Sequence, residues 1–293
     1  MAKFFQDKVA LITGGSRGLG LQIARELCAR GAKVCLLARD ADELDRAKAD
    51  LARFTTDVLT IQCDLLESAQ IQSAVQQTLQ HFRAIDILIN NAGIIEVGPI
   101  EHAQLKDFDR NMRIHFWAPY ILYLLVTPHM RAKGGGRIVN ISSFGGRVGV
   151  PHLAAYCASK FALTGFSDAA RAELARDKIY VTTVTPGLMR TGSDVRAQFK
   201  GDHAAEYRWF RSSLKVPLSS ISIERAARKI VNACRDGKAA LIMPFTAYLI
   251  TAASAVFPNL SAGVMRYVNR CLPPRVSQEG NEARTGLAIR AGK

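Results

Sequence analysis

The sequence predicts an α/β fold with a doubly wound parallel sheet in a single domain, and three observations support this. Short apolar runs alternate along the chain with helix-like stretches, the pattern of a parallel sheet covered on both faces. A glycine-rich turn directly follows the first run and opens the first helix. Finally, 48% of the 293 residues are hydrophobic and no linker separates two cores, so one large core is expected.

Each strand and helix is assigned from its hydrophobic period, in chain order. A strand is placed at a run of roughly four to eight residues dominated by apolar side chains, and a helix where apolar residues recur three or four positions apart. Pro244 interrupts any single helix that would continue past the last strand. The expected strands are 8–13, 33–38, 57–62, 85–89, 136–142, 179–185 and 239–243, and the expected helices are 18–30, 41–53, 68–82, 105–132, 152–177 and 222–236.

Two segments lie outside this alternation. Residues 188–221 carry basic side chains from Arg190 to Lys215, with Tyr207, Trp209 and Phe210 among them. They form either a solvated amphipathic helix over the core or a lid on the substrate. Residues 273–293 are polar after Pro273-Pro274 and are expected to be disordered, so the folded domain is expected to cover residues 1–272.

The chain carries a net charge of +14 and has an isoelectric point near 9.8. This excess predicts an anionic partner: a phosphorylated cofactor, an acidic carrier or a membrane surface. The arginines are dispersed and the sequence has no nucleic-acid motif, so nucleic acid is not expected as a partner.

Residues 239–265 contain no charge and are numerous enough to span a bilayer. Ala239 to Phe245 also supply the last strand, however, and Ala, Ser and Thr dilute the apolarity of the remainder. We therefore expect first that this segment belongs to a substrate pocket or a dimer contact. Peripheral contact with a membrane and a membrane span are the alternatives.

Six cysteines without C-x-x-C spacing predict neither a disulfide framework nor a metal site. Cys35 and Cys63 fall in expected core strands, which fits a reducing compartment. The start of the sequence has no signal-peptide pattern. We expect a cytoplasmic protein, with membrane association as the alternative.

Tyr156, Lys160 and Ser143 form the strongest candidate for chemistry. In a helix Tyr156 and Lys160 lie at i and i+4 on one face, where the ammonium favours the tyrosinate. Lowering the pKa of a tyrosine by about 3 units requires roughly 4 kcal/mol, so a second positive charge, such as a nicotinamide ring, is expected beside the lysine. Ser143 follows an expected strand and can hold a substrate oxygen from the other side. Together they predict a redox enzyme.

Further short motifs resemble those of one family. The turn Thr13-Gly14-Gly15-Ser16-Arg17-Gly18-Leu19-Gly20 has the spacing G-x-x-x-G-x-G, and it is followed in order by Asp64, Asn90-Asn91-Ala92-Gly93, Ser143, the Tyr156/Lys160 pair and Pro186-Gly187. Over residues 6 to about 245 this arrangement closely resembles the short-chain dehydrogenase/reductase family. The resemblance implies a Rossmann fold and a nicotinamide cofactor.

The resemblance also implies a role for each matching position. Ser143 and Tyr156 match the catalytic serine and acid/base, Asp64 meets the adenine, and Lys160 holds the nicotinamide ribose as well. The residues implied in cofactor binding are Gly14, Ser16, Arg17, Gly18, Leu19, Gly20, Arg39, Asp64, Leu65, Asn90, Ala92, Gly93, Tyr156, Lys160, Pro186, Gly187 and Thr191.

The expected cofactor is NADP(H). An acidic residue at the end of the second strand would bind a ribose diol and repel a 2′-phosphate, but Ala38 occupies that position. Arg39 follows it and Arg17 lies in the glycine turn, an arrangement similar to that of family members that use NADP(H). Two guanidinium groups can clamp a phosphate.

His115 departs from the family pattern. It stands where the family usually has an asparagine that completes a catalytic tetrad by holding a water in a proton relay from the lysine. Imidazole can also bind water and relay protons, which makes His115 a candidate catalytic residue. The alternative is that His115 only fills a bend in the helix and the relay is lost.

We expect an enzyme that interconverts a ketone or aldehyde and an alcohol on a lipophilic small molecule, because residues 156–163 and the apolar C-terminal extension look similar to the hydroxysteroid and retinol dehydrogenase branch. The alternatives are reduction of a 3-oxoacyl group on an acidic carrier, a non-catalytic nucleotide sensor or scaffold, and a membrane-tethered interaction protein. The helices at 105–132 and 152–177 are apolar around much of their circumference, which predicts a homodimer or homotetramer.

Overall fold

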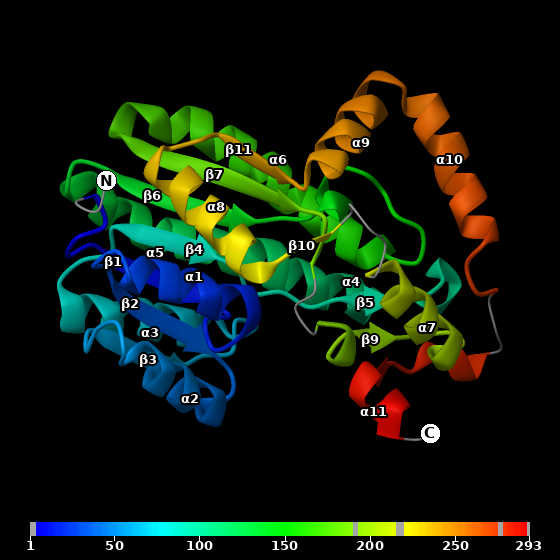
Figure 1. Cartoon of the computed structure of the whole chain (residues 1–293), viewed down its shortest axis with the longest axis horizontal. Coiled ribbons are helices and arrows are strands. Elements are labelled where there is room, and N and C mark those ends of the chain that lie inside the picture. The colour runs from blue at the N-terminus through cyan, green and yellow to red at the C-terminus, as the bar shows by residue number, and fades with distance from the viewer. Residues whose placement is uncertain (1–3, 190–192, 215–219, 275–277, 292–293) are drawn as a thin grey trace.

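Seven parallel strands form the central sheet of the computed structural model, which describes residues 4–189, 193–214, 220–274 and 278–291 (Figure 1). All seven expected strands are confirmed, with ends that differ by a few residues at most. Across the sheet the order is β11 (Ala240–Met243), β7 (Ile179–Pro186), β6 (Gly136–Ile141), β4 (Ile87–Asn90), β1 (Val9–Thr13), β2 (Lys33–Ala38) and β3 (Val58–Gln62).

Helices cover both faces of this sheet and enclose two apolar cores (Figure 1). In β1, Ala10 and Ile12 point into one core and Leu11 into the other, because successive side chains of a strand alternate between faces. One face carries α1 (Gly18–Cys28), α2 (Ala41–Leu51) and α8 (Ile223–Arg235), and the other carries α3 (Ser68–Phe82), α5 (Ala118–Ala132) and α6 (Ala154–Leu174). The predicted doubly wound fold is confirmed.

The single helix expected at 105–132 is interrupted. It consists of α4 (Leu105–Met112), a π-helical turn at Arg113–Trp117 and then α5. The wider turn contains His115, which is buried. Single π-helical turns of this kind often occur at functional sites.

The segment expected as a lid or amphipathic helix is folded around a small core of its own. Helix α7 (His203–Ser213) packs Tyr207 and Phe210 against Phe199. Two small sheets support it: β5 (Glu96–Val97), β9 (Gln198–Phe199) and β12 (Arg284–Thr285) form one, and β8 (Leu188–Met189) and β10 (Ser220–Ile221) form the other. Short 3₁₀ helices cover Ile100–His102, Phe144–Gly146, Ala175–Asp177, Ser193–Val195 and Gln278–Asn281.

The tail expected to be disordered is ordered over residues 278–291, where this prediction was wrong. β12 pairs antiparallel with β9, and α11 (Gly286–Ala291) follows it. Arg290 makes an ion pair with the buried Asp194 at 2.9 Å and a hydrogen bond to the Tyr207 hydroxyl. Backbone pairing and a charge contact hold this tail, and neither produces the hydrophobic period on which the prediction relied.

After β11 the chain forms two helices, α9 (Phe245–Val256) and α10 (Pro258–Arg270), which extend away from the sheet (Figure 1). Within 239–265 the described side chains are mostly exposed, and the chain itself buries Met243, Ala247 and Thr251. No single helix in the described part of the chain has both the length and the apolarity to cross a membrane, whereas α9 and α10 meet both criteria as a pair that bends by 120°.

Candidate active site

Four neighbouring strands of the sheet, β7, β6, β4 and β1, end at the same edge because they are parallel. The glycine turn follows β1, the Asn91-Ala92-Gly93 segment follows β4, and Ser143 follows β6. β1 and β4 lie side by side at the centre of the sheet. From β1 the chain proceeds towards one edge of the sheet, through β2 and β3, and from β4 it proceeds towards the other edge, through β6, β7 and β11. Such a reversal of strand order is where open α/β sheets bind ligands.

The glycine turn leaves backbone exposed to a ligand. Gly14 and Gly18 have φ of 62° and 55°, values that favour glycine. A Cβ on Gly20 would overlap the Gly14 carbonyl oxygen, and a Cβ on Gly14 would lie 3.0 Å from the Ala92 Cα. The turn therefore packs closely against the start of α1, whose free N–H groups favour an anion.

Asn91 connects this turn to the segment after β4. Its Nδ2 donates to the carbonyl oxygens of Thr13 and Gly14 at 3.0 and 3.1 Å, while the Thr13 hydroxyl accepts from the backbone of Asn91 and Ala92. Sequence reasoning did not assign a role to Asn91. A sign of its role was present in the sequence, where two adjacent asparagines, Asn90 and Asn91, stand at the end of a strand. Because successive side chains of a strand point to opposite faces, the two asparagines must have different surroundings.

Asn90, the other member of that pair, was expected to line the cofactor site and is instead buried between strands. Its Nδ2 donates to Asn140 Oδ1 at 2.8 Å, and Asn140 in turn donates to Ser167 of α6. The Asn90 Oδ1 is buried and has no hydrogen-bond partner among the described residues. Asn90 therefore ties β4 through β6 to the helix that carries Tyr156.

Arginine side chains gather around one carboxylate beside the glycine turn. Glu43 of α2 is buried, accepts from the Ser16 hydroxyl at 2.9 Å, and pairs with Arg17 at 3.2 Å and with Arg196 at 2.5 Å. Burial and the charges of Arg196 and Arg39 lower the pKa of Arg17, which places all three guanidinium groups in one neighbourhood. Arg39 itself is exposed. The cluster holds more positive than negative charge and could accept a phosphate.

Glu43 and Arg196 were both missed from the sequence. The cofactor preference was predicted from the residue at the end of the second strand, Ala38. Glu43 stands five residues beyond that position and was therefore not considered. Arg196 lies 153 residues further along the chain, and no local pattern connects the two.

The remaining expected cofactor residues lie around the same edge. Asp64 and Leu65 follow β3 and are half-buried, with Asp64 Oδ1 accepting from Leu66 N at 3.0 Å. Leu19 is buried in α1, Pro186 ends β7, and Gly187 N donates to Met243 O at 2.7 Å. Thr191 lies outside the described residues.

Ser143, Tyr156 and Lys160 come together at the end of β6 and the start of α6. The Ser143 Oγ accepts from Gly145 N at 3.1 Å, which leaves the hydroxyl proton free to donate. The Lys160 ammonium lies 5.9 Å from the centre of the Tyr156 ring and donates to Ile141 O at 2.9 Å. Gly93 packs against His115, because a Cβ there would lie 2.9 Å from His115 Nε2, and the same Cβ would lie 3.7 Å from Lys160 Nζ.

Burial shifts the pKa values of Tyr156 and Lys160 so that the uncharged form of each side chain is favoured. It raises the pKa of Tyr156 to about 12, against which a hydrogen bond with Ser143 acts, and it lowers the pKa of Lys160 to about 7. At neutral pH the phenol is therefore protonated. Forming a tyrosinate here requires positive charge beyond that of Lys160.

Both ring nitrogens of His115 are occupied by the protein. Its Nε2 accepts from Ile94 N at 3.1 Å, so in the neutral ring the proton lies on Nδ1, which donates to Ser159 Oγ at 2.7 Å. Burial and the nearby Lys160 hold the pKa of His115 well below its ordinary value. The imidazole therefore links the segment after β4 to α6, and no ring nitrogen is free to bind a water.

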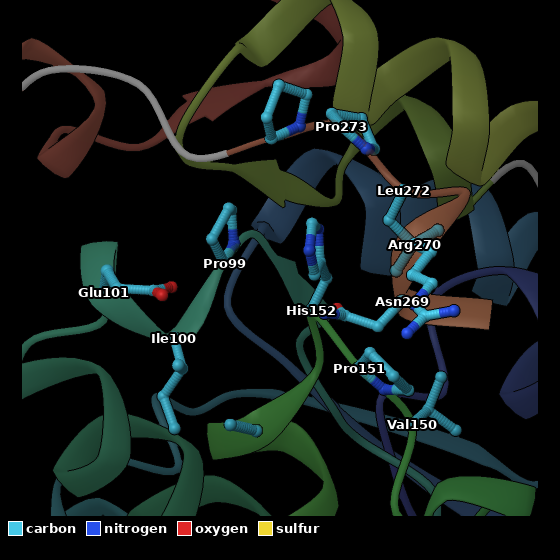
Figure 2. A pocket seen from close by; sticks show the side chains of 12 residues that line it. Pro99, Ile100, Glu101, Val150, Pro151, His152, Asn269, Arg270, Leu272 and Pro273 are labelled. Carbon is cyan, nitrogen blue, oxygen red and sulfur yellow. The ribbon is translucent and has the colours of Figure 1, made fainter. Parts of the chain in front are cut away.

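A cavity of about 440 Å³ lies between the segment that precedes Tyr156 and the end of α10 (Figure 2). Its lining mixes apolar side chains, among them Pro99, Ile100 and Pro151, with the polar or charged side chains of Glu101, Asn269 and Arg270. His152, which also faces it, pairs at 2.8 Å with Glu206 of α7. That contact joins α7 to the segment that leads to Tyr156.

Comparison with known proteins identifies the family. The model of the short chain dehydrogenase family matches residues 8–200. The chain belongs to this family. It is 39% identical over 201 residues to a dehydrogenase/reductase SDR family protein 7-like from Anopheles gambiae, a match that covers 67% of this chain and 63% of that protein.

Two further relatives extend the comparison. The chain is 30% identical over 270 residues to the putative oxidoreductase SadH of Mycobacterium tuberculosis, covering 90% of this chain and 97% of that one. The crystal structure of L-sorbose reductase from Gluconobacter frateurii, complexed with NADPH and L-sorbose, aligns with a TM-score of 0.73 at 28% identity over 81% of this chain and 95% of that one. The chain spans less than two thirds of the length of the Anopheles gambiae relative, and its membership of the short-chain dehydrogenases places it in a family of oxidoreductases.

Proposed function

We propose that this short-chain dehydrogenase is an NADP(H)-dependent enzyme that interconverts a ketone or aldehyde and the corresponding alcohol on a lipophilic small molecule. The observation that carries the proposal is the position of Tyr156, hydrogen-bonded to Ser143 and backed by the buried Lys160, at the edge where the glycine turn lies. An acid, a polarising hydroxyl and a cation are the groups that carbonyl reduction needs.

The residues around the glycine turn suit NADP(H). Gly18 has open space around it and leaves the backbone accessible to a pyrophosphate, while Gly14 and Gly20 allow the turn to pack closely beside it. Arg17, Arg39 and Arg196 supply positive charge for a 2′-phosphate. When bound, this cofactor supplies the hydride that the carbonyl carbon receives. The NADPH complex of the related L-sorbose reductase supports the same choice.

The proton comes from the chain itself. As the carbonyl carbon gains the hydride, the C=O electron pair moves to oxygen and Tyr156 gives that oxygen its phenolic proton, which leaves an alcohol and a tyrosinate. Ser143 donates a hydrogen bond to the same oxygen, and the Lys160 ammonium stabilises the tyrosinate until a proton from solvent replaces the one lost. Because burial raises the pKa of Tyr156 to about 12, the proton-donating form that carbonyl reduction needs prevails at neutral pH.

The apolar part of the lining of the cavity, which reaches Ala154 two residues before Tyr156, supports a lipophilic substrate, while Glu101, His152, Asn269 and Arg270 make the rest of the lining polar. Pro99, Ile100, Val150, Pro151 and Leu272 contribute to the apolar part, and the cavity volume of about 440 Å³ falls in the range of small-molecule sites. The resemblance to the hydroxysteroid and retinol dehydrogenase branch agrees with this chemistry.

The test is a screen of apolar ketones and aldehydes that follows NADPH absorbance, with Tyr156→Phe as the diagnostic variant. Tyr156→Phe removes only the hydroxyl, so NADPH affinity should persist while reduction falls by at least about 100-fold. Tyr180→Phe, at an exposed tyrosine of β7, is the matched control and should keep the parent rate. If Tyr156→Phe reduces any substrate as fast as the parent, the proposed mechanism is wrong and a nucleotide sensor or scaffold becomes the better hypothesis.

A further inference from the structure

Helices α9 and α10 form a hairpin that the rest of the chain hardly covers (Figure 1). α9 begins at the carboxyl end of β11 and buries only Ala247 and Thr251, and α10 has no buried residue. A helix of a folded domain normally buries an apolar stripe against the core. This α9–α10 hairpin therefore lacks the partner that its composition calls for.

The hairpin exposes large apolar side chains at its turn and along both arms. Val256, Phe257 and Leu260 at the turn are exposed by 67, 58 and 67%. The two arms continue this surface with Phe245, Tyr248, Leu249, Ile250, Val264 and Tyr267, which are all exposed as well. A contiguous apolar surface of this kind marks an interaction site.

The charged residues that flank this surface along the sequence, from Lys238 to Arg270, are positive. Residues 239–265 carry no charge. The charged residues next to them are Lys238 before the hairpin and Arg266 and Arg270 at the end of α10, and all three are basic. No acidic residue occurs between Asp236 and Glu279, and the whole chain has a net charge of +14. A partner that complements this surface therefore has an apolar interior and a negatively charged surface.

The dimensions of the hairpin fit that description. With 12 and 13 residues, its arms are about 18 and 20 Å long, shorter than the roughly 30 Å hydrocarbon core of a bilayer. Arg266 follows Pro258 by eight positions, about 12 Å along α10. Elements that lie in a membrane interface bury their apolar side by about 5–10 Å. At that depth the turn reaches the acyl chains while the arginines lie among the headgroup phosphates.

We propose that the α9–α10 hairpin docks the protein on a bilayer surface that contains anionic lipid. A second copy of the chain fits the surface less well. It would bring the arginines of two hairpins together without acidic counterparts, since the hairpin has none. An exposed aromatic surface elsewhere, where Trp117 and Tyr120 of the π-turn and α5 pack around Phe116, is available for self-association.

Docking would also bring the cavity of Figure 2 close to lipid, because Asn269 and Arg270 at the end of α10 belong to its lining. Lipid is the phase that holds a lipophilic substrate. This consequence rests on the proposed function, whereas the docking itself does not. Membrane binding is therefore measured without substrate.

The test is flotation of the full chain with vesicles of phosphatidylcholine alone and of phosphatidylcholine mixed with phosphatidylserine. The parent should float with the mixed vesicles and much less with phosphatidylcholine, and added salt should release it. Phe257→Ser combined with Leu260→Ser should lower the partition coefficient on the order of 100-fold, because two large apolar side chains leave the acyl region. Arg266→Gln should lower it about 5-fold for the mixed vesicles only.

Leu287→Ser, at an exposed leucine of α11, is the matched control and should bind as the parent does. NADPH binding and thermal unfolding verify that each variant is folded. The proposal is overturned if the parent binds neither vesicle, if it binds both equally, or if the turn variant binds like the parent. It is also overturned if the turn variant dissociates a dimer in sedimentation without affecting flotation, which would make the hairpin a contact between copies.

Discussion

Replacing Lys160 with methionine should make the cofactor-free protein more stable and inactive. Lys160 is 4% exposed, and its ammonium has one hydrogen bond, to Ile141 O at 2.9 Å. Burial lowers its pKa from 10.5 to about 7, which corresponds to a cost of at most about 5 kcal/mol for holding the charge inside the folded state. Methionine fills a similar space without charge. After about 1 kcal/mol is subtracted for the lost hydrogen bond, Lys160→Met should gain up to about 4 kcal/mol at neutral pH.

The pH dependence has a definite sign. Between pH 7 and the unfolded pKa of 10.5, the unfolded state keeps a proton that the folded state has lost, so the stability of the parent rises with pH. Below about pH 7 both states are protonated and the parent carries the full cost. The advantage of Lys160→Met is therefore largest at pH 7 and below, and it should shrink by about 3 kcal/mol by about pH 9.5.

Urea unfolding of the parent and the variant at both pH values measures this difference. Lys229→Met, at an exposed lysine of α8, is the control and should change stability by less than about 0.5 kcal/mol at either pH. NADPH affinity and turnover of Lys160→Met should both fall, because the lysine is proposed to bind the cofactor and to stabilise the tyrosinate. A variant that is less stable than the parent at neutral pH, or whose effect is independent of pH, would refute the argument that Lys160 is a buried and poorly compensated charge.

Three further predictions concern cofactor choice, His115 and assembly. Arg39→Asp should reverse a preference for NADPH over NADH by on the order of 10- to 100-fold per lost contact, and equal affinities of the parent for both cofactors in a titration at fixed salt contradict the assignment. His115→Gln keeps an acceptor for the Ile94 N–H and should retain most turnover per folded enzyme. His115→Ala should lose at least about 3 kcal/mol of stability in urea unfolding. A His115→Gln enzyme that is stable yet inactive would instead support a proton relay through the imidazole. Sedimentation at micromolar concentration should show a dimer or tetramer that Trp117→Arg dissociates, and a monomeric parent rules out association through that surface.

The fate of the two asparagines after β4 shows the limit of motif reasoning. The motif identified Asn90-Asn91-Ala92-Gly93 as one unit, and the structure divides the work within it. Asn90 binds Asn140 inside the sheet, and Asn91 holds the glycine turn. Which neighbour reaches which face depends on the phase of the strand, and a motif does not specify it.

His115 shows the same limit for chemistry. Sequence comparison with the family pattern left two alternatives, a relay through the imidazole and a residue that fills a bend. The structure places the ring in a π-helical turn between Ile94 and Ser159, so the side chain connects the segment after β4 to α6. Those partners lie 21 and 44 residues away, beyond the reach of any local pattern.

The sequence alone determined the order of the strands and helices of the central sheet and indicated Ser143, Tyr156 and Lys160 as the candidate catalytic set, because hydrophobic period and glycine spacing act over a few neighbouring positions. Only the tertiary structure decided which groups meet across long separations. It brought Arg196 to Glu43, folded the polar tail onto β9, and left the α9–α10 hairpin exposed. An apolar run has the same composition whether it is buried or uncovered, and a charge is paired or unpaired only by its neighbours in space. These outcomes depend on how distant segments pack against one another, and the order of residues along the chain does not specify that packing.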